Sequence, residues 1–315
     1  MGLKIIVLAK QVPDTRNVGK DAMKADGTVN RAALPAIFNP EDLNALEQAL
    51  RLKDRYPGSE VTILTMGPGR AADIIREGLY RGADNGYLLT DRAFAGSDTL
   101  ATSYAISCAI KKISDYDIII AGRQAIDGDT AQVGPQVAEK LGLPQVTYAE
   151  EIVSVTEGIV AEDDKYGVPH AILADEVSLN IKGSLVIKRR LERGVETVGT
   201  TFPCVLTVNA SAPDCRPRNA KKVQKYKHAK TVTEIQDQSE DYMDLTADRP
   251  YLKIEEWSVN DIETDINWLG LSGSPTKVKK IENVVFQAKE AKKISSDESE
   301  LEELIVELIE NHTIG

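Results

Sequence analysis

This chain of 315 residues is short of cysteine, histidine and positive charge, and each shortage narrows the range of possible functions. Three histidines are too scattered for a metal cluster or a catalytic triad, so no metal site is predicted. A net charge of −11 argues against nucleic-acid binding, because a phosphate backbone would be repelled. The three cysteines show no metal or disulfide spacing, which favours a reducing cytoplasm: Cys108, Cys204 and Cys215.

Long apolar runs are also lacking, so no membrane span is predicted. Residues 3–9 already have the pattern of a buried strand, and we therefore expect no signal peptide before them. A hydrophobic content of 42% and a charged content of 28% are typical of a globular protein. The length is sufficient for two domains, or for one domain with a long extension.

The first half of the chain alternates strand patterns with helix patterns. Apolar runs predict strands at residues 3–9, 60–66, 87–90, 118–121 and from 146. Helices are predicted between them, one of which starts clearly, with Asn39 as N-cap, Pro40 at the first helical position and acids in the first turn. This alternation predicts an α/β fold with a doubly wound parallel sheet.

Residues 117–143 are the most informative stretch. A buried strand is followed by a turn-rich loop, residues 122–130, and then by an amphipathic helix carrying Val133 and Val137. Helix N-termini at the carboxyl ends of parallel strands favour phosphate groups, although the stretch could also be an ordinary connection. The helix start is open: Asp129 and Gln132 resemble a capping box, whereas Gly134 before Pro135 would mark a later start.

A second turn of interest is Gly67-Pro68-Gly69, which follows the strand at 60–66. With the residues after it, the turn matches the loose dinucleotide pattern G-x-G-x-x-A. Asp91 lies at the end of the next strand, where a ribose-binding acid is expected. The alternative interpretation is a tight turn between strand and helix.

The second half of the chain has a different sequence pattern. Short strand patterns at 185–188, 196–200 and 204–208 have no long helices between them, and residues 216–230 contain seven Lys or Arg. This basic run is either a solvated loop or a docking surface for an acidic partner. Residues 299–309 form an amphipathic helix whose apolar face must be buried. We expect an α/β domain over residues 1–209 and a partner-binding arm over residues 210–315.

Several motifs resemble the beta, or small, subunit of electron-transferring flavoproteins. They are VLAKQVPDT, NPEDLNALEQALRLK, TMGPG, RGADNGYLLTDRAFAGSDTLATSYA, AGRQAIDGDTAQVGPQVAEKLGLP and, in the tail, LGLSGSPTKVKKI. The resemblance covers nearly all of residues 1–150. It implies a flavodoxin-like or adenine-nucleotide alpha hydrolase fold. It also implies a heterodimer with a larger alpha subunit that the arm wraps.

The family includes conventional members, whose beta site holds structural AMP, and electron-bifurcating members, whose beta site holds a second FAD. The stretch Gly128-Asp129-Thr130-Ala131-Gln132-Val133-Gly134-Pro135 resembles the bifurcating kind. That resemblance implies that FAD exchanges a hydride with NAD(H) and that electrons are divided between ferredoxin or flavodoxin and an alpha-subunit FAD. The TMGPG turn would then lie near NAD(H), through Gly67, Pro68 and Gly69.

The resemblance also implies which residues bind the nucleotide. No side chain acts as a catalytic acid or base, because the flavin does the chemistry. The cofactor-binding positions carried over from the family are Ala9, Asn39, Met66, Gly122, Arg123, Gln124, Asp127, Gly128, Asp129, Thr130, Gln132, Val133 and Gly134. Arg123 is the expected cation near a flavin or phosphate.

One departure concerns the partner. Members that serve acyl-CoA dehydrogenases carry a recognition loop resembling L-N-E-P-R-Y before a lysine-rich run, whereas residues 211–219 here read SAPDCRPRN. The hydrophobic anchor is missing, so a different flavoprotein dehydrogenase becomes plausible, such as one acting on a 2-hydroxy acid like lactate. The basic run survives, with candidate docking residues Arg216, Arg218, Lys221 and Lys222.

Overall fold

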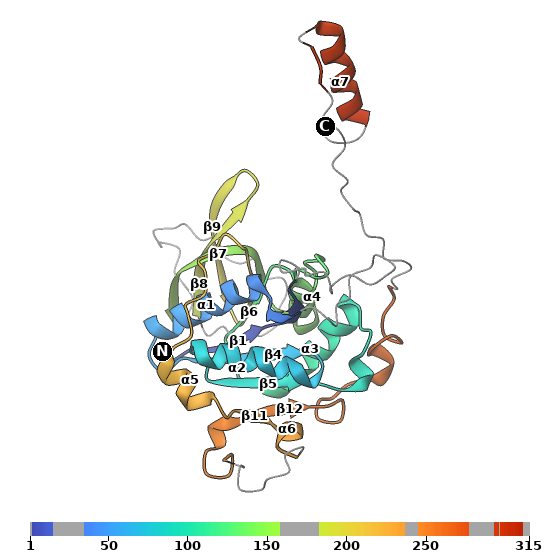
Figure 1. Ribbon diagram of the computed structural model, residues 1–315. Coiled ribbons are helices and arrows are strands. Elements are labelled where there is room, and N and C mark those ends of the chain that lie inside the picture. Colours follow the sequence, from blue (N-terminus) through green and yellow to red (C-terminus); the bar gives the residue numbers. More distant parts are fainter. Residues whose placement is uncertain are drawn as a thin grey trace. The chain divides into compact units, whose positions relative to one another are not determined.

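A computed structural model describes residues 2–14, 35–157, 183–236, 245–276, 293–295 and 297–310. The chain divides into two compact units, Met1–Lys279 and Lys280–Gly315. Figure 1 shows the elements of both. No helix in the described ranges has the length and apolar character needed to cross a membrane.

The first unit is built on one sheet, in the order β11-β12-β5-β4-β1-β6-β10-β7-β8-β9 (Figure 1). Its parallel centre consists of β5 (Asn85–Leu89), β4 (Glu60–Met66), β1 (Lys4–Leu8), β6 (Ile118–Gly122) and β10 (Cys204–Val208). On one side follow β7 (Gln145–Glu157), β8 (Gly183–Leu191) and β9 (Gly194–Phe202). On the other lie β12 (Lys253–Trp257) and β11 (Lys230–Thr231). A separate antiparallel pair joins β2 (Gln11–Pro13) to β3 (Ala36–Phe38).

Helices cover both faces of this sheet, which makes it doubly wound as predicted. Apolar residues of α1 (Pro40–Arg55) and α2 (Ala72–Arg81) share one hydrophobic core with Ile63 of β4. Those of α3 (Thr99–Ile113) and α4 (Val133–Leu141) share the other core with Leu64, the next residue along the strand. Successive side chains of a strand point to opposite faces, so continuous apolar runs are what a sheet buried on both faces requires.

The second half of the first unit is more structured than we predicted. β10 enters the sheet between β6 and β7, and β8 and β9 extend it as antiparallel strands. The basic run is not a solvated loop, because it contains α5 (Ala220–Tyr226) and leads into β11. The described part of the chain also contains the short helix α6 (Val232–Gln236) and the 3-10 turns Gly69–Ala71, Arg92–Phe94, Pro250–Leu252 and Ile266–Trp268.

Residues after 209 contribute directly to the core of the first unit. Tyr226, Leu252 and Ile254 are all buried in the cluster that also contains α1. β12 pairs with β5 along Tyr87–Leu89, so it serves as a strand of the main sheet. The division of the chain after Lys279 therefore does not coincide with the boundary expected after residue 209.

The second unit contains α7 (Glu298–Glu310), the predicted amphipathic helix. Its apolar residues are largely exposed, with Leu301 at 42% and Ile305 at 49% of their full surface. A helix with so much exposed apolar surface is typical of a segment that associates with another surface.

Candidate functional site

The candidate site lies at the carboxyl ends of β1 and β6, where the first turn of α1 meets the loop after β6. Gly122 makes this meeting possible. A Cβ atom added there would lie 2.4 Å from Oδ1 of Asp42 and 2.6 Å from the carbonyl carbon of Glu41. The strand end and the helix start therefore approach more closely than any other residue would allow.

Asp42 joins the two strand ends. Its carboxylate accepts hydrogen bonds from the backbone N–H of Lys10, at 2.8 Å, and of Gly122, at 3.0 Å. Asp42 is buried, and this burial raises the pKa of its carboxyl group to about 7 although the two N–H donors act in the opposite direction. A buried, hydrogen-bonded carboxyl group thus links the residues that follow β1 to the end of β6.

Glu41 orients Arg123. Its carboxylate accepts from Nη2 of Arg123 at 3.0 Å and from the backbone N–H of Gln124 at 3.1 Å. The guanidinium carbon also lies 5.8 Å from the centre of the Tyr148 ring. The hydrogen bond with Glu41 is the main cause that raises the pKa of Arg123. Arg123 is therefore a fixed cation with a carboxylate partner.

Asn39 has the predicted position at the start of α1, but its side chain does not cap the helix. It donates from Nδ2 to the carbonyl of Gln124 at 2.9 Å and accepts at Oδ1 from the backbone N–H of Ile126 at 3.1 Å. The prediction of Asn39 as the N-cap residue is confirmed, but its side chain bonds the loop after β6 and not the N–H groups of α1. Asn39, Glu41 and Asp42 together hold residues 122–126.

The rest of the loop is arranged around exposed backbone. Lys10 forms an ion pair with Asp127 at 2.7 Å, and Gln124 donates to Asp129 at 2.9 Å. Asp129 and Ala131 have positive φ angles of 49° and 53°, a conformation that costs energy in residues other than glycine. Such backbone is frequent in concave arrangements of N–H groups that bind anions.

Neither of the two predicted starts of the helix after residue 130 is correct. α4 begins at Val133 with Gln132 as the N-cap, so Asp129 is too early for a capping box and Gly134 lies inside the first turn. Gly134 has a packing role, since a Cβ there would lie 2.5 Å from Cγ2 of Thr207. Gly128 in contrast faces open space, with nothing within 4 Å.

Two buried polar atoms near these elements have no hydrogen-bond partner among the described residues, Oγ1 of Thr65 and Oε1 of Gln136. Thr65 precedes Met66 at the carboxyl end of β4, and Gln136 lies in the first turn of α4. Thr99, at the start of α3, donates to Oε1 of Gln132 at 2.8 Å and so brings a second helix N-terminus next to the first. Buried polar atoms without partners are costly, and a polar ligand would satisfy them.

The tight turn at residues 67–69 is held by two backbone hydrogen bonds. The N–H of Gly67 donates to the carbonyl of Leu89, and that of Ala71 to the carbonyl of Pro68, at 3.0 and 2.7 Å. The carboxylate of Asp91 accepts from the backbone N–H groups of Ala93 and Val259. Asp91 is thus engaged in holding the turn after β5 to the segment after β12.

Comparison with known proteins gives consistent results. Residues 26–169 match the family model described as "Electron transfer flavoprotein domain". The chain is 42% identical over 278 residues to "Electron transfer flavoprotein subunit beta" of Clostridium acetobutylicum, covering 88% of this chain and 87% of that protein. It belongs to the family of electron transfer flavoprotein beta subunits.

Two further family members carry more specific names. "Acryloyl-CoA reductase electron transfer subunit gamma" of Anaerotignum propionicum is 39% identical over 318 residues, 99% of this chain and 100% of that protein. "Caffeyl-CoA reductase-Etf complex subunit CarD" of Acetobacterium woodii is 45% identical over 205 residues, 65% of this chain and 68% of that protein.

Against this family background, the residues present fit a nucleotide. Backbone N–H groups at the start of α4, the positive-φ loop and the unpaired polar atoms supply donors and acceptors. Among the described residues, four carboxyl groups lie close by and are paired with two cations, Lys10 and Arg123: those of Glu41, Asp42, Asp127 and Asp129. A phosphate is therefore expected on the α4 side, where backbone dipoles attract it.

Sequence reasoning missed Glu41, Asp42 and Thr99. The two acids were interpreted only as favourable charges in the first turn of α1, although a carboxylate next to a strand end has backbone donors of the loops within reach. Thr99 had no distinguishing signal beyond following the helix cap Asp98.

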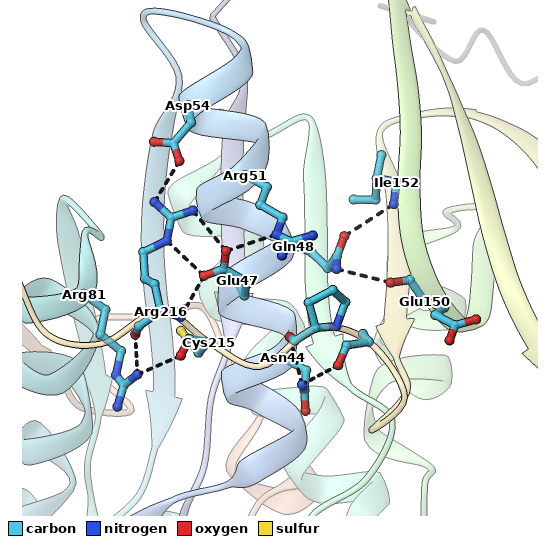
Figure 2. Close-up of polar contacts among 12 residues, drawn as sticks. Asn44, Glu47, Gln48, Arg51, Asp54, Arg81, Glu150, Ile152, Cys215 and Arg216 are labelled. Carbon is cyan, nitrogen blue, oxygen red and sulfur yellow. Dashed lines mark hydrogen bonds and ion pairs between the residues drawn. The ribbon is translucent and has the colours of Figure 1, made fainter.

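The predicted docking residues lie elsewhere. Arg216 lies beside the second half of α1 (Figure 2), and Arg218 and Lys222 line a cavity together with Leu50 and Lys53 of that helix. Arg216 uses its guanidinium within the chain, with Nε and Nη2 donating to Glu47 at 2.9 and 3.1 Å and Nη1 donating to Asp54 at 2.7 Å. The carbonyl of Arg216 accepts from Arg81 at 2.5 Å. Arg216 therefore anchors its segment to α1. Docking of a partner through Arg216, Arg218, Lys221 and Lys222 stays a prediction.

The raised pKa of Asp42 predicts a pH-dependent stability. Between pH 3.8 and about 7 the folded chain keeps a proton that the unfolded chain has lost, so the unfolding free energy falls as pH rises. The total fall expected from this group is about 4 kcal/mol. Asp42→Asn should remove this part of the pH dependence, as measured by urea unfolding at several pH values. Asp214→Asn, at an exposed aspartate, should keep it, and equal slopes in both variants would contradict the assignment.

Proposed function

We propose that this chain is the beta subunit of an electron-bifurcating electron transfer flavoprotein and binds FAD at the candidate site. A bound FAD would supply hydride exchange with NAD(H) in either direction and the release of electrons one at a time. These electrons would be divided between ferredoxin or flavodoxin and an FAD on the alpha subunit that feeds a flavoprotein dehydrogenase. The alternative is a conventional subunit that holds AMP and shuttles electrons.

The observation that carries this proposal is the loop at residues 122–131. Three side chains at the start of α1 hold its first half, and its second half presents backbone in the positive-φ conformation directly before α4. A loop held in this way is preorganised to bind a diphosphate without losing much conformational freedom. The sequence from Gly128 to Pro135 favours FAD over AMP, because it resembles that of the bifurcating members.

The residues proposed to contact the bound nucleotides are those expected from the family. Arg123, fixed by Glu41, would stand near the negative charge of a reduced flavin or a phosphate, where it tunes the potential as well as binding. Gly67, Pro68 and Gly69 are proposed to approach NAD(H). The remaining proposed nucleotide contacts are Ala9, Asn39, Met66, Gly122, Gln124, Asp127, Gly128, Asp129, Thr130, Gln132, Val133 and Gly134.

The partner protein is proposed to be a larger alpha subunit, wrapped by the C-terminal arm that includes α7. The exposed apolar residues of this helix support the proposal. Two relatives are named for reductases of CoA esters, which favours an acyl-CoA dehydrogenase as the electron partner over a 2-hydroxy-acid dehydrogenase. The departure at residues 211–219 acts against a conventional acyl-CoA recognition loop. The complex is proposed to act in the cytoplasm.

Nucleotide content decides between the two kinds of subunit. The alpha–beta complex is denatured, and the released nucleotides are separated by chromatography and quantified against protein. Two FAD per alpha–beta pair without AMP is the expected result. One FAD and one AMP per pair would refute the bifurcating proposal and establish the shuttle.

A further inference from the structure

Tyr148 adopts a backbone conformation that its residue type disfavours. Its φ angle is 58°, in the left-handed region, although the residue lies within β7. Between two aligned pairs of the sheet, β10 contributes only Thr207, whereas β7 contributes Thr147 and Tyr148. The extra residue makes a β-bulge, and in one common type of bulge a glycine occupies the left-handed position. Strained backbone of this kind in an aromatic residue points to a functional role.

The two strands beside β7 hold the bulge in place. Arg189 of β8 donates from Nε to the carbonyl of Thr147 and from Nη2 to its Oγ1, both at 2.9 Å. The backbone N–H of Tyr148 donates to Oγ1 of Thr207, a buried residue of β10, at 3.4 Å. These contacts on both sides meet the condition under which a strained conformation persists.

The bulge places Tyr148 at the edge of the candidate site. Gly122 at the end of β6 pairs with Val208 of β10, and Val208 pairs in turn with Ala149, the residue after the bulge. Tyr148 is 38% exposed, and the centre of its ring lies 5.8 Å from the guanidinium carbon of Arg123. Bulges next to sites often redirect a side chain, and this one brings the ring to Arg123.

Arg123 is therefore held between a carboxylate and an aromatic ring. Glu41 accepts from Nη2 and Nε of Arg123 at 3.0 and 3.3 Å, and the ring of Tyr148 adds a cation–π contact. Within the described part of the chain, Nη1 of Arg123 makes no hydrogen bond. This nitrogen is the donor left for a bound anion.

We propose that Tyr148 is a positioning residue, whose ring keeps the guanidinium of Arg123 turned so that Nη1 meets an anionic group of the bound nucleotide. A flat, rigid ring restrains the plane of a guanidinium, which a flexible aliphatic side chain would not do. The strained bulge is retained because it brings the ring to this position. The anion is a phosphate or the reduced flavin ring. The inference rests on the proposed binding of a nucleotide at residues 122–131.

The test counts the nucleotide bound per alpha–beta pair while the free nucleotide is lowered in steps by dialysis. FAD is used in its oxidised form and, without oxygen, in its dithionite-reduced form, and AMP is used separately. The FAD of the alpha subunit serves as an internal reference, since substitutions at Tyr148 should leave its retention unchanged. The free concentration at which the beta-site nucleotide is half lost gives its affinity.

The first comparison concerns the ring itself. Tyr148→Ala should weaken binding at the beta site by about tenfold, and Tyr148→Phe, which keeps the ring, should stay within about threefold of the wild type. Equal weakening for oxidised and reduced FAD assigns the anion to a phosphate, whereas a loss confined to reduced FAD assigns it to the flavin ring. Tyr251→Ala is the matched control, because it removes a ring that lies 4.7 Å from the ammonium group of Lys225, and it should change binding by less than about twofold.

A double-mutant cycle tests whether Tyr148 acts through Arg123. Arg123→Gln alone should weaken binding by about tenfold or more. Adding Tyr148→Ala to this variant should weaken binding by less than about twofold further, because no guanidinium remains to be positioned. A further tenfold loss would mean that the ring contacts the nucleotide directly or supports the fold, and it would overturn the positioning role.

Thermal unfolding separates this role from a purely structural one. At a φ of 58° glycine is tolerated better than alanine, so Tyr148→Gly should melt about 2 °C above Tyr148→Ala, the reverse of their order in a regular strand. Both variants should bind the nucleotide equally weakly, so that stability and binding change independently. A higher melting temperature for Tyr148→Ala would show that the bulge is not strained and would contradict its proposed purpose.

Failure of the inference and failure of the proposed function give different results. A wild-type complex without any nucleotide at the beta site would refute both. A wild-type complex that holds one, with Tyr148→Ala as harmless as Tyr251→Ala, would refute the positioning role and leave the proposed function untouched.

Discussion

Gly122→Ala is expected to lower the unfolding free energy by about 3 kcal/mol and to abolish nucleotide retention. The added methyl group would overlap with Asp42 Oδ1 and with the backbone of Glu41, at 2.4 and 2.6 Å. Backbone in the first turn of α1 cannot move aside without breaking the hydrogen bonds that hold residues 122–126. Urea unfolding and chromatography of the released nucleotide measure the two effects.

Gly128→Ala is the matched control for this prediction. It adds the same methyl group to the same loop, at a position with nothing within 4 Å. The unfolding free energy should then change by no more than about 0.5 kcal/mol. If both substitutions destabilised the chain equally, the close approach of β6 and α1 would not be what makes Gly122 necessary.

The second large effect is expected from Arg216→Gln, which should cost about 3 kcal/mol of unfolding free energy. Glu47 is buried, with 7% of its side chain exposed, and it receives three hydrogen bonds from Arg216, one of them from the backbone N–H. Removing the guanidinium leaves a buried carboxylate with weaker compensation. Segment 212–216 should also loosen, because Arg216 connects it to Asp54 as well.

Arg51→Gln provides the control, since Arg51 pairs with the same carboxylate from one helical turn away. Its side chain is 47% exposed, and exposed pairs of this kind contribute about 0.5 kcal/mol or less. Urea unfolding of both variants at the same pH gives the comparison. A cost for Arg51→Gln that matches the cost for Arg216→Gln would contradict the anchoring role of Arg216.

The central strands and the helices between them were predictable from local pattern. Residues 60–66 were predicted as a strand and match β4, and the apolar positions of α1 at Leu46 and Leu50 are buried as the stripe required. A strand buried on both faces needs a continuous apolar run, and a helix on the sheet needs one apolar stripe. Both requirements are visible in a few consecutive residues.

The candidate site was only partly predictable. Asn39 was identified by its position before Pro40, yet its side chain binds Gln124 and Ile126, more than eighty residues away along the chain. The start of α4 at Val133 was missed because Pro135 is tolerated in a first turn, where its missing N–H has no helical partner. Local signals cannot reveal which distant donor a polar side chain will bind.

The sequence by itself determined the alternation of strands and helices, the amphipathic character of α7 and the family, since each is written in contiguous residues. Tertiary structure decided that β10 lies between β6 and β7, that β12 extends the main sheet beside β5, and that Arg216 is an anchor. These features join residues far apart in the chain, and their energies depend on which surfaces meet. Glu41 and Asp42 illustrate this difference. Their charges could be read from the sequence, but their role in binding the backbone N–H groups of Gly122 and Gln124 depends on how the end of β6 packs against α1.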